Sequence, residues 1–250
     1  MMLLKKKRAQ DGLREADVAY ENTVEIQNVT KRYNMEGGNT CLALDRVSLT
    51  VPRGEFLAIV GTSGSGKSTP LHILGGVEEP TPGSVKVCGR ELYEMNDNAL
   101  SAFRCKEIGM VFQFFNLIPV LNVEENIAFP VIASGGKPDF GKTYRLLKRL
   151  GMEKYRYNLP GRLSGGQQQR IAVGRALMNE PALILADEPT GNLDTKNGTE
   201  VMDLFQTLCR ENGATLIVVT HDERIAARAD RIVRIEDGRV ISDEKRAQAV

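Results

Sequence analysis

The chain has 250 residues, with 33 Lys or Arg and 32 Asp or Glu, so its formal net charge is +1. This length gives roughly one to two domains and enough core to fold without disulfides or a structural metal. The balanced charge argues against a protein that binds nucleic acid through bulk positive charge. No apolar run approaches the roughly 20 residues of a membrane-spanning helix, so any work at a membrane would require a partner.

The first 22 residues carry five basic and four acidic side chains and little apolar periodicity. We therefore expect residues 1–22 to form a flexible leader. The basic run 5–8 has no apolar segment behind it, so it does not resemble a secretory signal. Contact of this run with anionic lipid is an alternative role for the leader. Without an export signal, we expect a cytoplasmic protein with reduced thiols. The chain has four cysteines, Cys41, Cys88, Cys105 and Cys209.

From Val24 onward, apolar patterns predict strands and helices. Alternation predicts strands at 24–26 and 44–51, and short apolar runs predict buried strands at 55–60, 183–186 and 215–219. Helices are expected at 167–178 and 195–210. Buried strands that alternate with helices predict an α/β fold with a parallel sheet. Between about 95 and 178 helical patterns dominate, apart from 108–112, which predicts a helical subdomain inserted in the sheet domain.

Residues 61–68 read GTSGSGKS, which fits the phosphate-loop pattern G-x-x-x-x-G-K-[ST]. The segment follows a predicted strand and precedes a predicted helix, as this motif requires. Its backbone amides and the helix N-terminus would surround phosphate oxygens. Lys67 is expected to reach the β- and γ-phosphates, and Ser68 to bind Mg²⁺. The predicted nucleotide contacts here are Gly61, Ser63, Gly64, Ser65, Gly66, Lys67, Ser68 and Thr69.

Asp187 and Glu188 directly follow the apolar run 183–186. A carboxylate at the end of a buried strand is costly unless a cation or hydrogen bonds meet it. Asp187 therefore suits the Mg²⁺ shell, and Glu188 suits a base that orients the attacking water. The alternative, a solvated turn after a strand, is less favoured because the same chain contains a phosphate loop.

Residues 163–167 read LSGGQ and stand between the phosphate loop and the acidic pair. This pentapeptide resembles the signature of ATP-binding-cassette (ABC) ATPases. Other residues match that family's motifs in order: the adenine-stacking aromatic, the Q-loop glutamine, the D-loop aspartate and the switch histidine. In this chain they are Tyr33, Gln113, Asp194 and His221. Taken singly, a tyrosine such as Tyr33 after a strand is usually a packing residue, and Asp194 could also cap the helix that follows.

The resemblance covers roughly residues 24–242. It implies an ABC-type nucleotide-binding domain at 23–242 and a tail at 243–250. Its fold would be that of a P-loop NTPase: a mostly parallel sheet core, an antiparallel β part and an inserted helical subdomain at about 95–178.

The family resemblance also implies an ATP hydrolase with ATP and Mg²⁺ as cofactors. Two subunits, two copies of this chain or a paired ATPase subunit, would pair head to tail. Ser164, Gly165, Gly166 and Gln167 of one subunit would contact the ATP held by the other, close to Asp194. Glu188, His221 and Gln113 would be catalytic, with Gln113 also a metal ligand beside Ser68 and Asp187. Water would attack the γ-phosphate in line.

Three segments narrow the resemblance: 71–76, 112–119 and 191–194. They resemble the lipoprotein-release, macrolide-export and cell-division ATPases. This implies an ATPase subunit that drives an export or mechanotransmission permease and lies on the inner face of the cell membrane through that permease. Apolar residues follow Gln113, namely Phe114, Phe115, Leu117 and Ile118. They would either border the permease groove or pack inside the helical subdomain. The alternative function is a soluble ABC ATPase for cluster assembly or for cell-wall or cell-division regulation, and neither function involves nucleic acid.

Pro70 departs from the family pattern, in which leucine or threonine is usual at this position. We expect the helix after the phosphate loop to begin near Lys67, which places Pro70 in its first turn. There a missing N–H costs little, but the proline ring faces the carbonyl of Gly66 and restrains Thr69. The sequence thus predicts either weakened nucleotide binding or a turn that absorbs the ring without penalty.

Overall fold

The computed structural model describes residues 20–34, 40–62 and 66–246. Residues 1–19 of the predicted leader, 247–250 of the predicted tail and the loop residues Ser63, Gly64 and Ser65 lie outside this description. Among the described residues, no helix has the length and apolar character needed to cross a membrane. The cysteines at 41, 88, 105 and 209 are all unpaired thiols.

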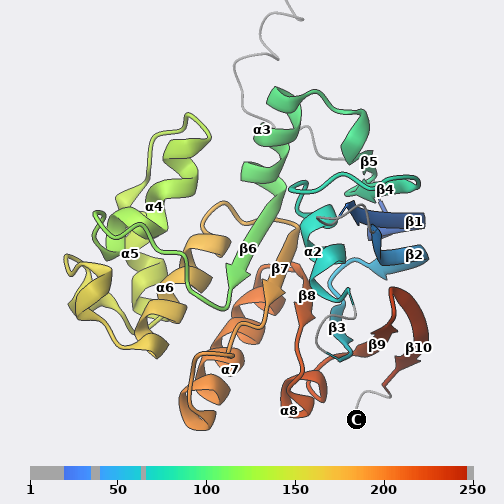
Figure 1. Cartoon of the computed structure of the whole chain (residues 1–250). Helices are drawn as coiled ribbons and strands as arrows, with labels where there is room; N and C mark the ends of the chain where they lie inside the picture. The colour runs from blue at the N-terminus through green and yellow to red at the C-terminus, as the bar shows by residue number, and fades with distance from the viewer. Residues whose placement is uncertain (1–19, 35–39, 63–65, 247–250) are drawn as a thin grey trace, which may run out of the picture.

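The strands form two sheets (Figure 1). The larger is mostly parallel, as the sequence predicts, and its strand order is β10-β9-β3-β8-β7-β6. Only the pair of β9 with the edge strand β10 is antiparallel in it. Its strands are β3 (Phe56–Val60), β6 (Ile108–Phe112), β7 (Leu183–Asp187), β8 (Thr215–Val219), β9 (Arg231–Glu236) and β10 (Arg239–Lys245). The smaller sheet is antiparallel and has the order β2-β1-β4-β5. Its strands are β1 (Asn22–Asn34), β2 (Thr40–Pro52), β4 (Ser84–Val87) and β5 (Arg90–Glu91).

Alternate residues of the central strands enter two separate cores. On β7, Ile184 and Ala186 belong to one apolar cluster, and Leu183 and Leu185 belong to the other. The first cluster lies against α6 and α7, and the second contains residues of α2 and of the antiparallel sheet. A strand buried on both faces reads as a continuous apolar run, which is why these segments were recognisable in the sequence.

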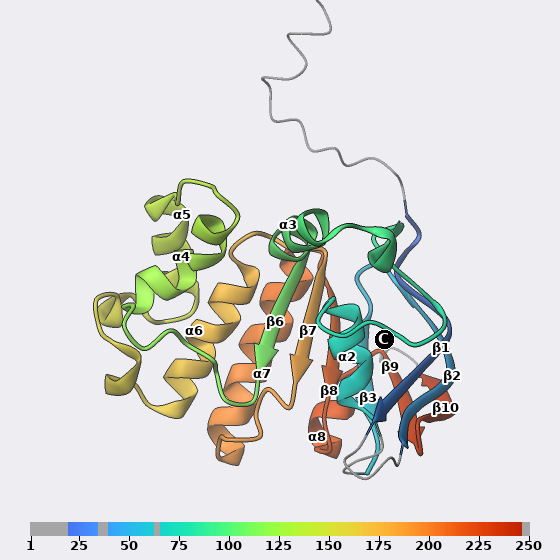
Figure 2. The same ribbon diagram turned by 45° about the horizontal axis from the view of Figure 1, so that its top comes forward.

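The helices flank the larger sheet (Figures 1 and 2). They are α2 (Ser68–Leu74), α3 (Asp97–Glu107), α4 (Val123–Ala133), α5 (Phe140–Arg149), α6 (Gly165–Leu177), α7 (Thr195–Glu211) and α8 (Glu223–Ala226), with short 3-10 turns at Leu92–Glu94, Glu153–Tyr155 and Pro160–Arg162. Helices α4 and α5 stand out beside α6, away from the antiparallel sheet. The range 95–178, proposed as the helical subdomain, contains α3 to α6 and also β6, the edge strand that pairs with β7.

The register of the parallel strands brings the carboxyl ends of β6, β7 and β8 side by side at one end of the larger sheet. Phe112 of β6 lies beside Asp187 of β7, and Asp187 lies beside Val219 of β8. The residues that directly follow these strands therefore lie at the same end of the sheet. In these three places the chain continues with Gln113, Glu188 and Thr220-His221.

Candidate functional site

The phosphate loop connects the end of β3 to α2. Gly66 has φ +90°, and a Cβ at this position would collide with the backbone carbonyl of Ala43. Only glycine fits such a conformation and such a close approach. The Lys67 side chain is buried, and its Nζ donates to the Thr62 carbonyl at 2.5 Å. Its positive charge is thus held against the loop.

Helix α2 begins at Ser68, one residue beyond the predicted start, and Pro70 is buried in its first turn. The backbone N–H of Thr69 donates to the Gly66 carbonyl at 3.2 Å. This carbonyl lies four residues before Pro70, which offers it no N–H. The missing donor is therefore replaced locally, and the first turn forms around the proline ring.

A hydroxyl and a carboxylate meet at the end of β7. Ser68 Oγ donates to Asp187 Oδ1 at 3.0 Å, and burial raises the pKa of Asp187. Among the described residues no group of three or more His, Cys, Asp or Glu could hold a metal. Mg²⁺ is usually held by one or two protein oxygens together with substrate phosphates and water, so this small donor set fits Mg²⁺ bound with a nucleotide.

Glu188 has a left-handed backbone, with φ +45°. Its Oε1 accepts the backbone N–H of His221 at 3.1 Å and lies 2.7 Å from His221 Nδ1. Its Oε2 accepts the Thr220 hydroxyl at 3.3 Å. The Glu188 side chain is 18% exposed and that of His221 is 73% exposed. A restrained carboxylate next to an exposed imidazole can both orient a water molecule and accept its proton.

Gln113 lies against the segment that follows β7. Its Nε2 donates to Asn192 Oδ1 at 3.3 Å, while Asn192 Nδ2 donates to the Gln113 carbonyl at 3.0 Å. A Cβ on Gly191 would come within 2.8 Å of the Gln113 side chain. The described structure thus pairs Gln113 with Asn192, whereas the other predicted metal ligands, Ser68 and Asp187, bond to each other.

The signature segment forms the N-terminus of α6. Ser164 Oγ accepts the Gln167 N–H at 3.4 Å, and Gln167 Oε1 accepts the Ser164 N–H at 2.9 Å, which makes a capping box. Gly165 lies beside Leu193 and Gly166 beside Asn197, so the segment borders the start of α7.

Asp194 caps α7, the second role that the sequence allowed. Its Oδ1 accepts the backbone N–H groups of Lys196 and Asn197, both at 3.1 Å. The hydrogen bond from the Asn197 side chain is the main cause that lowers the pKa of Asp194.

Tyr33 lies near the end of β1, opposite Cys41 of β2. Its hydroxyl is bonded to the Glu78 carboxylate, and burial raises the pKa of Tyr33, with a further contribution from that bond. Glu78 also lies 3.2 Å from His72 Nδ1. Sequence reasoning missed Glu78, since a glutamate in a loop carries no pattern that points to a tyrosine 45 residues away.

Phe114 and Phe115 have different surroundings. Phe114 is 73% exposed, whereas Phe115 is half-buried beside Gly165. Leu117 packs against the larger apolar cluster. The two alternatives for this segment therefore apply to different residues: Leu117 packs inside, and Phe114 presents an apolar surface.

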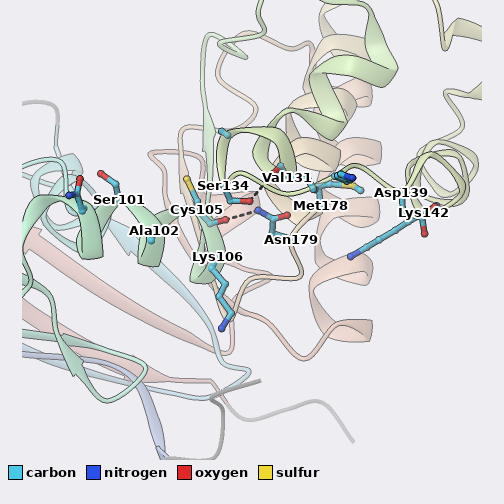
Figure 3. A pocket seen from close by; sticks show the side chains of 13 residues that line it. Ser101, Ala102, Cys105, Lys106, Val131, Ser134, Asp139, Lys142, Met178 and Asn179 are labelled. Carbon is cyan, nitrogen blue, oxygen red and sulfur yellow. Dashed lines mark hydrogen bonds between the residues drawn. The ribbon is translucent and has the colours of Figure 1, made fainter. Parts of the chain in front are cut away.

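A cavity of about 760 Å³ opens between α3, the end of α4 and the start of α5 (Figure 3). Ser101 and Ala102 of α3 line it, together with Val131 and Ser134 near the end of α4. Lys106 and Lys142 also line it. It lies near the amino ends of β6 and β7, whereas the phosphate loop follows the carboxyl end of β3, so the cavity is separate from the nucleotide site.

Comparison with known proteins decides the family. A model described as "ABC transporter" matches residues 44–191. The chain belongs to the ABC transporter family. The lipoprotein-releasing system ATP-binding protein LolD of Geobacter metallireducens is 44% identical over 222 residues, which is 88% of this chain and 98% of that protein. The macrolide export ATP-binding/permease protein MacB of Chlorobaculum tepidum is 45% identical over 90% of this chain. The chain spans about a third of that relative, 35% of its length.

Solved structures show the same ABC fold. The dimeric structure of a post-hydrolysis state of the ATP-binding cassette MJ0796, bound to ADP and Pi, has a TM-score of 0.82 and 42% identity. The match covers 90% of this chain and 99% of that cassette. These comparisons confirm the predicted family, the P-loop NTPase fold and an ATP-hydrolysing cassette that resembles the LolD and MacB proteins.

Proposed function

We propose that this ABC cassette is the ATPase subunit of a membrane complex, and that it binds and hydrolyses Mg-ATP at a head-to-tail dimer interface to drive an export or mechanotransmission permease. The observation that carries the catalytic part is the common end of the sheet, where Ser68 bonds to Asp187 and His221 bonds to the adjacent Glu188. The 44% identity to the lipoprotein-releasing system ATP-binding protein LolD supports an ATP-binding role in such a complex.

The phosphate loop and α2 bind the nucleotide in this proposal. The helix N-terminus and the Lys67 ammonium neutralise phosphate charge, and Tyr33 supplies an aromatic face for the adenine. Ser68 and Asp187 would hold Mg²⁺, and Gln113 would be a further ligand if it left Asn192. Bound Mg²⁺ would neutralise charge that develops on the phosphate oxygens.

Glu188 acts as the general base. Its two carboxylate oxygens are fixed by Thr220 and by the backbone and ring of His221, so the carboxylate is oriented before substrate arrives. His221 holds this carboxylate and is exposed enough to meet the γ-phosphate side of a nucleotide. Pre-set orientation of this kind removes reorganisation from the barrier.

The dimer interface would include the signature residues Ser164, Gly165 and Gly166 and the neighbouring Asp194. The α6 N-terminus offers backbone N–H groups to an anion, as helix N-termini do. A second copy of this chain would place these groups on the nucleotide held by the first. The dimeric arrangement of the cassette MJ0796 supports this pairing.

The permease would dock on the surface that carries Phe114, which is 73% exposed. Exposed apolar surface is a feature of protein interfaces. A permease would hold the cassette peripherally on the inner face of the cell membrane, in the cytoplasm. The alternative is a soluble ABC ATPase for cluster assembly or for cell-wall or cell-division regulation.

Affinity purification from solubilised membranes tests this proposal. Wild-type chain should retain an integral membrane protein, and Phe114→Glu should lose it while basal ATP hydrolysis stays unchanged. Ile241→Glu is the matched control, because Ile241 is 52% exposed on β10, at the opposite edge of the sheet from β6. Recovery of no integral membrane protein with the wild type would favour the soluble alternative.

A further inference from the structure

Gln169 of α6 connects two segments of the candidate active site. It is 0% exposed, and its Nε2 donates to the Phe112 carbonyl at 3.4 Å and to the Pro189 carbonyl at 2.5 Å. Phe112 directly precedes Gln113, and Pro189 directly follows Glu188. One buried amide therefore links the backbone at Gln113 to the backbone at Glu188.

Arg175, on the same helix, holds the other end of the Gln113 segment. Its Nη2 donates to the Phe115 carbonyl at 3.0 Å and its Nη1 to the Asn116 carbonyl at 2.6 Å. Phe115 and Asn116 both have left-handed backbones, with φ values of 59° and 48°. Asparagine adopts this conformation comparatively readily, whereas phenylalanine does so rarely, so Phe115 in particular needs contacts that hold it there.

The surroundings of Arg175 indicate that its guanidinium serves to bind the carbonyls of Phe115 and Asn116. Burial lowers the pKa of Arg175, and no ion pair with a carboxylate is found for it in the parts of the chain that the structure describes, 20–34, 40–62 and 66–246. The buried part of a guanidinium needs acceptors for its N–H groups. A rigid fork matches two adjacent carbonyls, which the single ammonium of a lysine cannot do in the same way.

We propose that Gln169 and Arg175 are positioning residues that clamp residues 112–116 at both ends against α6. Through this clamp α6, whose first turn is the signature segment, sets the position of Gln113 and, through Pro189, of Glu188. Neither residue is among those proposed above to contact the nucleotide. The proposal rests on the roles proposed above for Gln113 and Glu188, and it predicts that displacement of α6 by a partner subunit is transmitted to both.

Hydrogen exchange of the nucleotide-free protein tests the clamp without reference to catalysis. In Arg175→Lys and in Gln169→Met, amides of residues 113–118 should exchange about tenfold faster, while amides of β3 and α7 keep wild-type rates. Arg210→Lys is the matched control, because Arg210 lies exposed on α7 and pairs with Asp230 at 3.8 Å. Wild-type exchange at 113–118 in both clamp variants would overturn the proposal, and so would faster exchange throughout the domain.

Steady-state kinetics then test the effect on catalysis. Both clamp variants should lower kcat for ATP hydrolysis about tenfold, with KM for ATP within about twofold of wild type, because binding groups are untouched and only alignment is lost. A rise in KM with unchanged kcat would contradict a positioning role. Gln113→Ala separates failure of the proposed function from failure of the clamp. Unchanged kcat in that variant would refute the proposed role of Gln113. The exchange rates would still test whether Gln169 and Arg175 hold residues 112–116.

Discussion

Replacement of Asp187 by asparagine should stabilise the nucleotide-free protein and abolish its response to Mg²⁺. The asparagine Oδ1 can still accept the hydrogen bond that Ser68 Oγ donates to Asp187 at 3.0 Å. The substitution therefore removes charge and little else. Burial raises the pKa of this carboxyl above the ordinary value of an aspartate, so its ionised form costs stability above the raised pKa. This cost fades as the pH falls through that pKa, so the gain should be present at pH 7 and absent below about pH 4.

The expected sizes follow from general scales. A gain of about 1 kcal/mol, within the range of about 0.5–2 kcal/mol found for stabilising substitutions, corresponds to a rise of about 2–4 °C in Tm for a chain of this length. In the wild type, Mg-ATP at a hundred times its Kd should add about 2.7 kcal/mol, or roughly 5–11 °C. Asp187→Asn should lose the part of this Tm shift that depends on Mg²⁺. The predicted protein ligands of Mg²⁺ are Ser68, Asp187 and Gln113, and the substitution removes the charge of the carboxylate among them.

Thermal unfolding in three conditions measures both effects: no nucleotide, ATP with excess chelator, and ATP with Mg²⁺. Asp203→Asn is the control, because Asp203 lies on the surface of α7 and pairs with Arg228. A lower Tm for nucleotide-free Asp187→Asn, together with a wild-type response to Mg²⁺, would refute the assignment of Asp187 as the metal-binding carboxylate.

Three further substitutions probe the same candidate active site. Lys67→Ala should weaken ATP binding, because it removes a direct phosphate contact, and unchanged affinity in a nucleotide titration would contradict the phosphate-loop assignment. Pro70→Leu should leave the Mg-ATP dissociation constant nearly unchanged, because the Thr69 N–H already bonds to the Gly66 carbonyl, and a tightening of about tenfold, or 1.4 kcal/mol, would show instead that the proline ring weakens nucleotide binding. His221→Ala should retain ATP binding but lower kcat about 10²-fold, because Glu188 loses the ring 2.7 Å from its Oε1, and wild-type turnover would exclude this role.

Much of the larger sheet could be predicted from sequence because its strands are buried on both faces. The runs ending at Val60, Ala186 and Val219 contain few polar residues, so their positions were recovered within a residue or two. The phosphate loop, the acidic pair and the signature were found for a different reason: each is a contiguous motif whose residue types are fixed by phosphate and metal chemistry.

The contacts between motifs could not be predicted in this way. Gln169 lies in a run of three glutamines, and sequence alone does not say which of them enters the core. The apolar run after Gln113 likewise gave no reason to place Phe114 in solvent and Leu117 inside. The left-handed backbones at Phe115 and Glu188 depend on bonds to distant residues, which no local propensity reports.

The most direct test of the account is the oligomeric state and turnover of Glu188→Gln in the presence of Mg-ATP. Glutamine keeps an oxygen for the His221 N–H but cannot take a proton from water, so nucleotide should bind and remain uncleaved. Light scattering should then give twice the monomer mass of 27.6 kDa, and hydrolysis should fall about 10²-fold or more. A chain that stays monomeric with saturating Mg-ATP would contradict the head-to-tail dimer, and wild-type turnover in this variant would contradict Glu188 as the base.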